Sequence, residues 1–211
     1  MRLTIIGATG RTGKHLVEQA LEAGYEVIAF ARNLSKLATT HERLTVVQGD
    51  ATDPAAVERA IQYADAVISV LNTSFVQDIA KTKPLTLITH NILKAMKIFG
   101  VRRLIITSAG IPQPNDLPDL RFSLLLGIGK LLMPPAVEDT INSAHIVQSS
   151  DIDWTIVRMA PTNATPTGQV NAGYVKRETK MFVSRADAAM FMLKELGENN
   201  WVRQAPVIFN T

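Results

Sequence analysis

The chain of 211 residues contains no cysteine, and this absence excludes several kinds of chemistry. Without cysteine there is no disulfide framework, no thiol nucleophile, and no zinc or iron–sulfur site with cysteine ligands. Histidine is also scarce, and its four positions lie far apart, with none of the spacings that bind metals: His15, His41, His90 and His145. The sequence therefore predicts no metal site.

Neither sign of charge is in large excess, since lysine and arginine number 22 and aspartate and glutamate 19. The basic residues are scattered, with only short pairs such as Arg102-Arg103. Nucleic-acid-binding proteins usually gather their positive charge on one face. The sequence therefore predicts no nucleic-acid partner.

Long hydrophobic runs are missing as well. The longest apolar stretch, residues 122–133, contains Lys130 and ends at Pro134-Pro135, whereas a membrane-spanning helix needs about 20 residues. At the N-terminus, the short apolar run Leu3–Ile6 gives way at once to glycines, which does not resemble a signal peptide. We therefore expect a cytoplasmic protein with no membrane partner; the oligomeric state is left open.

Short apolar runs alternate with helical patterns along nearly the whole chain. The runs predict seven strands: Leu3–Ile6, Glu26–Phe30, Leu44–Gln48, Ala66–Val70, Arg103–Thr107, Trp154–Met159 and Pro206–Phe209. The patterns between them predict six helices: Arg11–Ala23, Asn33–Thr39, Pro54–Ala60, Pro84–Phe99, Ala136–Ser149 and Arg185–Leu196. Strands that are apolar on both faces and alternate with helices form parallel sheets covered on both sides. We predict an α/β fold, a single Rossmann-type doubly wound domain over residues 1–211.

Two segments, 109–135 and 160–184, interrupt this alternation. Both follow predicted strands, at the edge where open α/β sheets bind their ligands, so we expect them to form the substrate side. Apolar residues would line it: Ile111, Phe122, Leu125, Leu126, Leu132, Met133, Met159 and Tyr174. Alternatively, residues 122–133 form a helix packed in the core or on a partner subunit.

The first predicted strand is followed directly by the sequence Gly-Ala-Thr-Gly-Arg-Thr-Gly, which opens the first helix. Glycines at these positions allow a tight turn, a close approach of backbone N–H groups to a pyrophosphate, and close packing of helix on strand. In this strand–turn–helix context the motif predicts a dinucleotide site. The residues expected to bind there are Gly7, Thr9, Gly10, Arg11, Thr12 and Gly13.

The end of the second strand indicates which dinucleotide binds. Sites that prefer NAD place an acidic residue there to hold the ribose 2′-OH, but this chain has Phe30-Ala31-Arg32. Arg32 can pair with a 2′-phosphate, with Arg11 and Lys36 adding positive charge, so we expect NADP (NADPH) as the cofactor. Other expected contacts are Asp50 and Ala51, with Asp50 either on the adenine edge or in a local turn, and Leu71, Asn72 and Thr73 near the riboses.

These motifs, together with Thr107-Ser108-Ala109-Gly110 and Trp154-Thr-Ile-Val-Arg158, resemble an atypical short-chain dehydrogenase/reductase. The resemblance is to its NAD(P)H-binding, NmrA-like group, which includes flavin reductase (biliverdin IXβ reductase). It implies a seven-stranded Rossmann sheet and flat redox substrates such as flavins, quinones or tetrapyrroles; some members only sense NADP. It also implies that Ser108, Pro161 and Thr162 lie beside the nicotinamide, and it makes His145, near a position where members often carry Glu or His, a candidate proton donor.

The chain departs from this family in its catalytic residues. None of the three tyrosines (Tyr25, Tyr63 and Tyr174) has a lysine four residues later, so the usual Tyr-x-x-x-Lys pair is missing. Alcohol–ketone chemistry and nucleotide-sugar epimerisation, which use that pair, are disfavoured. Ser108 and His145 are the remaining catalytic candidates, although each also suits a local structural role. Arg158 is expected to form a structural ion pair.

We predict an NADPH-dependent reductase that transfers hydride to a small, flat redox acceptor. The cofactor would supply the hydride and the protein its orientation in an apolar, water-excluding site. The alternative is a non-catalytic NADP(H)-binding sensor or interaction protein. This alternative would explain why the chain has a complete glycine loop for a dinucleotide but lacks the Tyr-x-x-x-Lys pair of catalytic residues.

Overall fold

The computed structural model describes residues 1–71, 84–109, 113–159, 162–163, 165–176, 179 and 182–210. The side chains of Ala109, Phe122, Leu125, Leu126 and Asn163 lie outside this description.

One eight-stranded sheet forms the centre of the molecule, in the order β3-β2-β1-β4-β5-β6-β10-β8. The strands are β1 (Arg2–Ile6), β2 (Glu26–Ala31), β3 (Leu44–Gln48), β4 (Ala66–Ser69), β5 (Arg103–Ala109), β6 (Asp153–Met159), β8 (Val170–Gly173) and β10 (Val207–Asn210). All neighbours pair in parallel except β8, which pairs antiparallel with β10 at the edge. The predicted doubly wound α/β fold is confirmed, and its seven predicted strands are extended by β8.

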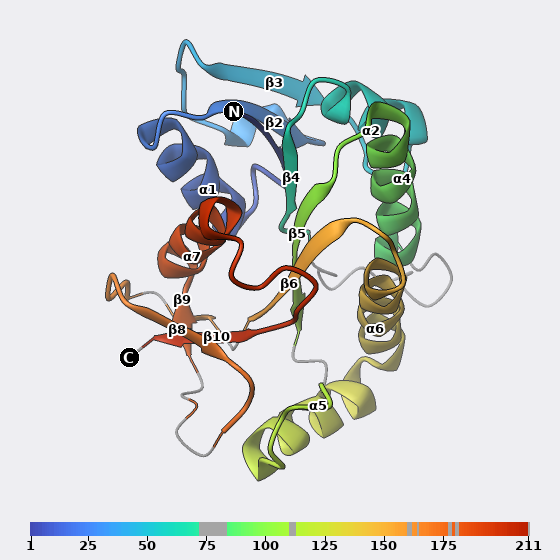
Figure 1. Cartoon of the computed structure of the whole chain (residues 1–211), viewed down its shortest axis with the longest axis vertical. Coiled ribbons are helices and arrows are strands. Elements are labelled where there is room, and N and C mark those ends of the chain that lie inside the picture. Colours follow the sequence, from blue (N-terminus) through green and yellow to red (C-terminus); the bar gives the residue numbers. More distant parts are fainter. Residues whose placement is uncertain are drawn as a thin grey trace.

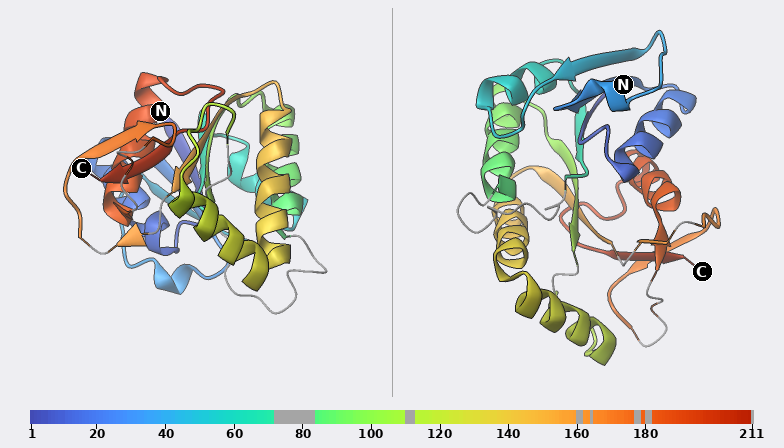
Figure 2. Two further views of the ribbon diagram at one scale, coloured as in Figure 1. Left: turned by 90° about the horizontal axis from the view of Figure 1, so that it is seen from below. Right: turned by 180° about the vertical axis from the view of Figure 1, so that it is seen from behind.

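Helices cover both faces of the sheet (Figures 1 and 2). On one face α1 (Arg11–Glu22) and α7 (Arg185–Glu198) pack side by side over a core of strand residues such as Leu3, Ile5 and Val157. On the other face α2 (Pro54–Ile61), α4 (Pro84–Phe99) and α6 (Pro134–Gln148) bury a second core. Because both faces of the sheet are covered, its inner strands are largely apolar, with a few buried polar residues such as Thr4 and Arg158.

The segment predicted as a helix over 33–39 contains only the three-residue 3-10 helix η1 (Leu34–Lys36). The side-chain oxygen of Asn33 accepts the backbone N–H of Ser35 at 3.0 Å and its hydroxyl at 2.6 Å, which fixes a local turn. No residue of η1 is buried. A longer helix therefore lacks an apolar face to bury, and the predicted extent was wrong.

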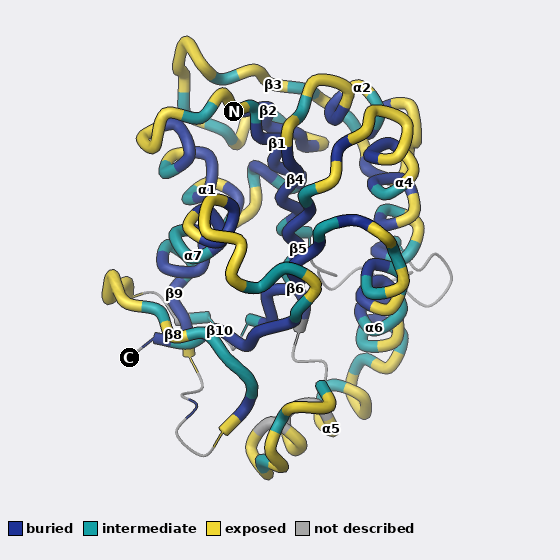
Figure 3. The backbone as a smooth tube through the Cα atoms, in the orientation of Figure 1, coloured by how far each residue is buried: buried dark blue, intermediate teal, exposed yellow. Residues whose placement is uncertain are grey.

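The two interrupting segments contain regular structure, including the helix that was predicted as the alternative for residues 122–133. Residues 109–135 include the helix α5 (Leu120–Leu132), at the carboxyl end of the sheet (Figure 1). Its outer side is apolar and exposed (Figure 3), with Leu120 83% and Leu131 81% accessible to solvent. Residues 160–184 include β8 and two short parallel strands, β7 (Thr162–Asn163) and β9 (Val183–Ser184).

Candidate cofactor site at the carboxyl edge of the sheet

The strand order places a topological switch point between β1 and β4. From β1 the chain continues outward through β2 and β3, and from β4 it continues in the opposite direction through β5 and β6. In open α/β sheets, ligands bind in the crevice outside the carboxyl ends of the strands at this point. The glycine loop, which follows β1, lies at this switch point.

Backbone hydrogen bonds hold the glycine loop against the end of β2. The N–H groups of Gly7 and Ala8 donate to the carbonyl oxygen of Phe30 at 3.0 and 3.3 Å, and the N–H of Gly10 donates to Gly7 O at 2.9 Å. Gly7 has a φ of +89°, a backbone conformation that side chains disfavour. A Cβ on Gly13 would overlap the carbonyl oxygen of Gly7 and lie 2.9 Å from Cα and C of Ala8.

The start of α1 is open to a ligand. Gly10 is the N-cap and supplies no side-chain hydrogen bond to the first turn, and Gly10 and Arg11 are exposed while Thr9 and Thr12 are partly buried. N–H groups at the start of a helix have no partner within the helix and favour anions. A side chain at Gly10 would fill the surface over these N–H groups, so the loop fits the pyrophosphate of a dinucleotide.

Arg32 and Asp50 lie beyond the ends of the neighbouring strands β2 and β3, and both are exposed. The carboxylate of Asp50 accepts the backbone N–H of Thr52 at 2.9 Å and its hydroxyl at 2.8 Å. The hydrogen bond from the backbone N–H of Thr52 has the largest effect and lowers the pKa of Asp50. Partial burial raises the pKa, but the hydroxyl of Thr52 and the charge of Arg32 lower it further, so that it is lowered overall. Asp50 thus forms the local turn that its sequence context also allowed.

The turn after β3 depends on packing that the sequence does not reveal. A Cβ on Gly49 would lie 2.7 Å from Cβ of Ala56 and 2.8 Å from the ring of Phe30. Ala51 is buried, and its carbonyl oxygen accepts the side-chain amide of Asn91 at 3.0 Å. Asn91 on α4 therefore positions the predicted adenine-side turn, and no pattern in the sequence predicted it.

Other predicted cofactor residues are only partly within the described chain. Leu71 follows β4, and its Cδ2 atom would lie 3.0 Å from a Cβ on Gly7. Thr162 is the first residue of β7 and is partly buried. Asn72, Thr73 and Pro161 lie outside the described residues.

Ser108, near the carboxyl end of β5, borders a small cavity between the sheet and helices α4 and α6. The cavity has room for about one water molecule. Half of its lining is hydroxyl-bearing: Ser69, Thr89, Thr107, Ser108, Thr140 and Ser143. The hydroxyls of Thr89 and Ser143 are 2.7 Å apart, and that of Thr140 donates to Ala136 O at 2.8 Å. No lining residue among the described ones carries a titratable side chain.

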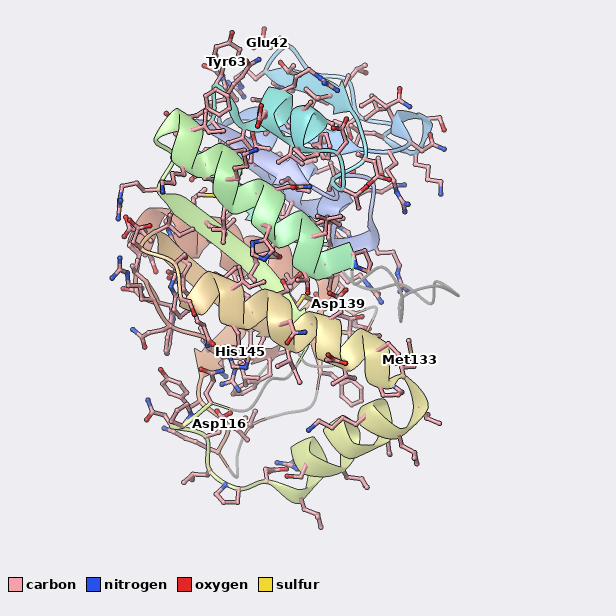
Figure 4. All side chains as sticks on the ribbon, turned by 90° about the vertical axis from the view of Figure 1, so that its right-hand side faces the viewer. Glu42, Tyr63, Asp116, Met133, Asp139 and His145 are labelled. Atoms are coloured by element: carbon pink, nitrogen blue, oxygen red, sulfur yellow. The ribbon has the colours of Figure 1, made fainter. Side chains whose placement is uncertain are left out.

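The structure does not bring His145 to this cavity. His145 is exposed on α6, whereas Ser143 and Ala144 on the same helix are buried. Figure 4 shows His145 in the second half of α6, at the opposite end from Met133. His145 is not among the described residues that line the cavity at Ser108.

Arg158 forms the structural ion pair that its sequence context predicted. Its guanidinium donates to both carboxylate oxygens of Asp116, at 2.6 and 2.8 Å, and to the carbonyl oxygen of Ala205 at 2.6 Å. Asp116 (labelled in Figure 4) also accepts the backbone N–H groups of Gln113 and Val175. Burial alone would raise the pKa of Asp116, but these donors lower it overall. The pair fastens the segment before α5 to β6.

Other predicted members of the substrate side vary in placement. Leu132 is exposed, and Met133 and Met159 are partly buried. The ring of Tyr174 packs edge-on against Trp201 with centroids 6.3 Å apart. Within the described residues there is no group of acidic or histidine side chains that could hold a metal ion, and no helix there is long and apolar enough to cross a membrane.

Comparisons with known proteins agree with this geometry. A model of the NAD(P)H-binding family matches residues 7–199. The chain is 26% identical over 204 residues to the uncharacterized protein YwnB of Bacillus subtilis, covering 93% of this chain and 92% of YwnB.

Two solved structures share the fold. A short-chain dehydrogenase/reductase from Veillonella parvula in complex with NADP has a TM-score of 0.79 and 19% identity, covering 98% of this chain and 93% of that one. ChuY, an anaerobilin reductase from Escherichia coli O157:H7, has a TM-score of 0.76 and 21% identity, covering 100% and 97%. The glycine loop at the switch point and the family match over residues 7–199 show that this chain belongs to the NAD(P)H-binding family.

Proposed function

We propose that this protein is an NADPH-dependent reductase that transfers hydride to a flat redox acceptor of the flavin, quinone or tetrapyrrole type. The observation that carries the proposal is the glycine loop after β1, whose open face over the first turn of α1 suits a pyrophosphate. When bound, the dinucleotide supplies the hydride. The chain's own residues bind and orient it and exclude water from the acceptor.

Arg32 supports NADPH over NADH. It follows β2 directly, where NAD-preferring sites carry an acidic residue, and it is exposed and forms no salt bridge among the described residues. A guanidinium can bind a 2′-phosphate through two hydrogen bonds. Thr52 donates two hydrogen bonds to Oδ1 of the nearby Asp50, and within the described chain Asp50 forms no salt bridge with Arg32.

The choice of a flat acceptor rests on the lack of a titratable side chain among the described residues that line the cavity at Ser108. Reduction of a ketone needs a proton donor such as the tyrosine of the Tyr-x-x-x-Lys pair, which this chain lacks. Flavin-like acceptors are easily reduced, and water can supply their proton. Ser108 then orients the nicotinamide or one acceptor atom by a single hydrogen bond. The similarity of fold to ChuY, named as an anaerobilin reductase, favours tetrapyrroles within this class.

The test is a titration with NADPH and NADH, followed by turnover assays with a flavin, a quinone and a linear tetrapyrrole. A charge-assisted contact contributes about 1.5–3 kcal/mol, or about ten- to a hundredfold in affinity. We expect Arg32→Ala to lose this much affinity for NADPH and to leave NADH binding almost unchanged. Equal losses for both cofactors would contradict the role of Arg32, and no oxidation of NADPH with any acceptor would contradict the reductase.

A second candidate is a non-catalytic NADP(H) sensor. It is favoured by the cavity at Ser108, which has no titratable side chain among its described lining residues, and by the exposure of His145. Tight binding of NADPH without turnover of any of the three acceptors would support the sensor and exclude the enzyme.

A further inference from the structure

Arg185 is the first residue of α7, and two packing interactions place it between the segment that follows β6 and α1, the helix that the glycine loop opens. It directly follows β9, which pairs with β7 through Thr162↔Val183 and Asn163↔Ser184. It therefore lies beside the segment that follows β6. Its helix also packs along α1, where the side-chain amide of Gln19 donates to Ala186 O at 3.1 Å.

The backbone at Arg185 is firmly held. The hydroxyl of Ser184 accepts the N–H of Asp187 at 3.0 Å, which caps α7. The carboxylate of Asp187 in turn accepts from Thr167 N, Gly168 N, Ser184 Oγ and Asn210 Nδ2, at 2.7 to 3.0 Å. These four donors engage the nearest acidic group along the chain, and among the described residues Asp187 accepts no hydrogen bond from Arg185.

Arg185 is partly buried, and neither it nor Arg11 has a carboxylate partner among the described residues. Burial lowers the pKa of Arg185, and the positive charge of Arg11 lowers it further. Arg11 and Arg185 are the first residues of two helices, α1 and α7, that pack against each other. Each helix end adds a partial positive charge of its own. Arginines in such a place favour an anion with more than one negative charge.

We propose that Arg185, together with Arg11, binds the pyrophosphate of the dinucleotide from the side of α7. This inference rests on the proposed function and deepens it. The 2′-phosphate is expected at Arg32, beyond β2, whereas α7 packs over β5 and β10 on the other side of β1. The pyrophosphate is common to NADPH and NADH. Arg185 therefore contributes to affinity for both cofactors and not to the choice between them.

The experiment compares Arg185→Met with Arg59→Met, which removes an exposed arginine from α2. Dissociation constants for NADPH and NADH are measured by titration. Thermal unfolding of each variant is measured without cofactor. We expect Arg185→Met to weaken both cofactors by the same factor, about tenfold or more, and this loss to shrink at high salt. Arg185→Lys should retain part of the affinity, and Arg59→Met should bind like the wild type.

Stability without cofactor separates binding from folding. Because Arg185 has no carboxylate partner and lies near Arg11, Arg185→Met should unfold at the wild-type temperature or slightly above it. Unchanged affinity in a folded Arg185→Met variant, while wild type and Arg59→Met bind NADPH, would overturn this inference alone. A loss confined to NADPH would also overturn it, because it would assign Arg185 to the 2′-phosphate. If the wild type binds neither dinucleotide, the proposed function fails, and this inference fails with it.

Discussion

Alanine at Gly13 should mainly lower stability and alanine at Gly10 should mainly weaken cofactor binding, because the two glycines have different surroundings. A Cβ at Gly13 would overlap the carbonyl oxygen of Gly7 and lie 2.9 Å from two backbone atoms of Ala8. Backbone atoms cannot rotate away as a side chain can. The loop would have to shift, which strains the bonds from Gly7 and Ala8 to Phe30 O.

The magnitude follows from two opposing terms. Alanine gains about 0.5–1 kcal/mol over glycine inside a helix. Overpacking typically costs about 1–3 kcal/mol, and more where the neighbours cannot move. We therefore expect Gly13→Ala to lose about 2 kcal/mol of unfolding free energy. For a chain of this size that corresponds to a fall in Tm of about 4–8 °C.

Gly10 has φ −71° and ψ 167°, which any residue adopts, and its Cβ would meet only Gly7 O at 3.1 Å. As an N-cap, alanine is somewhat worse than glycine, by about 0.5–1 kcal/mol. The added methyl would lie on the face that the pyrophosphate approaches. Gly10→Ala should therefore fold but bind NADPH at least about tenfold more weakly, or about 1.4 kcal/mol.

Urea unfolding and NADPH titration of both variants check this pair of expectations. The reasoning is refuted if Gly13→Ala unfolds at the same urea concentration as the wild type. It is refuted equally if Gly10→Ala retains full affinity for NADPH.

Three further predictions concern the supports of the site. Asp139→Ala removes a buried carboxylate that accepts three hydrogen bonds from the start of α4, and it should cost about 1.5–3 kcal/mol in urea unfolding; an unchanged midpoint would contradict this. The pKa of Asp116 is lowered in the folded state, so its pair with Arg158 stabilises above about pH 3.9. The difference in unfolding free energy between the wild type and Asp116→Asn should shrink below that pH; a difference that stays constant with pH would contradict this role of the ion pair. Ser108→Ala should slow turnover by about tenfold at most, as one neutral hydrogen bond predicts; a thousandfold fall would reveal acid–base catalysis.

The sequence predicted the central strands and the glycine loop because their signals are local. Leu3–Ile6 is buried throughout, and the loop that follows it needs glycine for reasons of backbone conformation and packing. Edge strand β8 gave no such signal. Its residues Val170–Gly173 alternate little in burial, and the strand depends on pairing with β10.

Helix α5 could not be predicted from periodicity. Its sequence is apolar on nearly every side and contains Gly127 and Gly129, so no stripe of apolar residues at helical spacing appears. Its outer leucines are exposed at the end of the sheet, where burial does not select a face.

Contacts distant in sequence were also beyond prediction. Asp116 lies 42 positions before Arg158, its ion-pair partner, and Asp139 caps a helix that begins more than 50 positions earlier. The sequence indicated that Arg158 would form an ion pair but not with which residue. Arg185 carries no motif, and its position beside α1 follows only from the fold.

The network around Asp187 affects which amide protons exchange with water. Thr167 and Gly168 lie between β7 and β8, in no helix or strand, yet their N–H groups donate to a carboxylate on the first turn of α7. The same carboxylate is bonded to Asn210 at the end of β10. These two amides are therefore released only when the loop separates from α7. Their deuterium uptake reports the opening of that junction between loop, helix and strand rather than the motion of a surface loop.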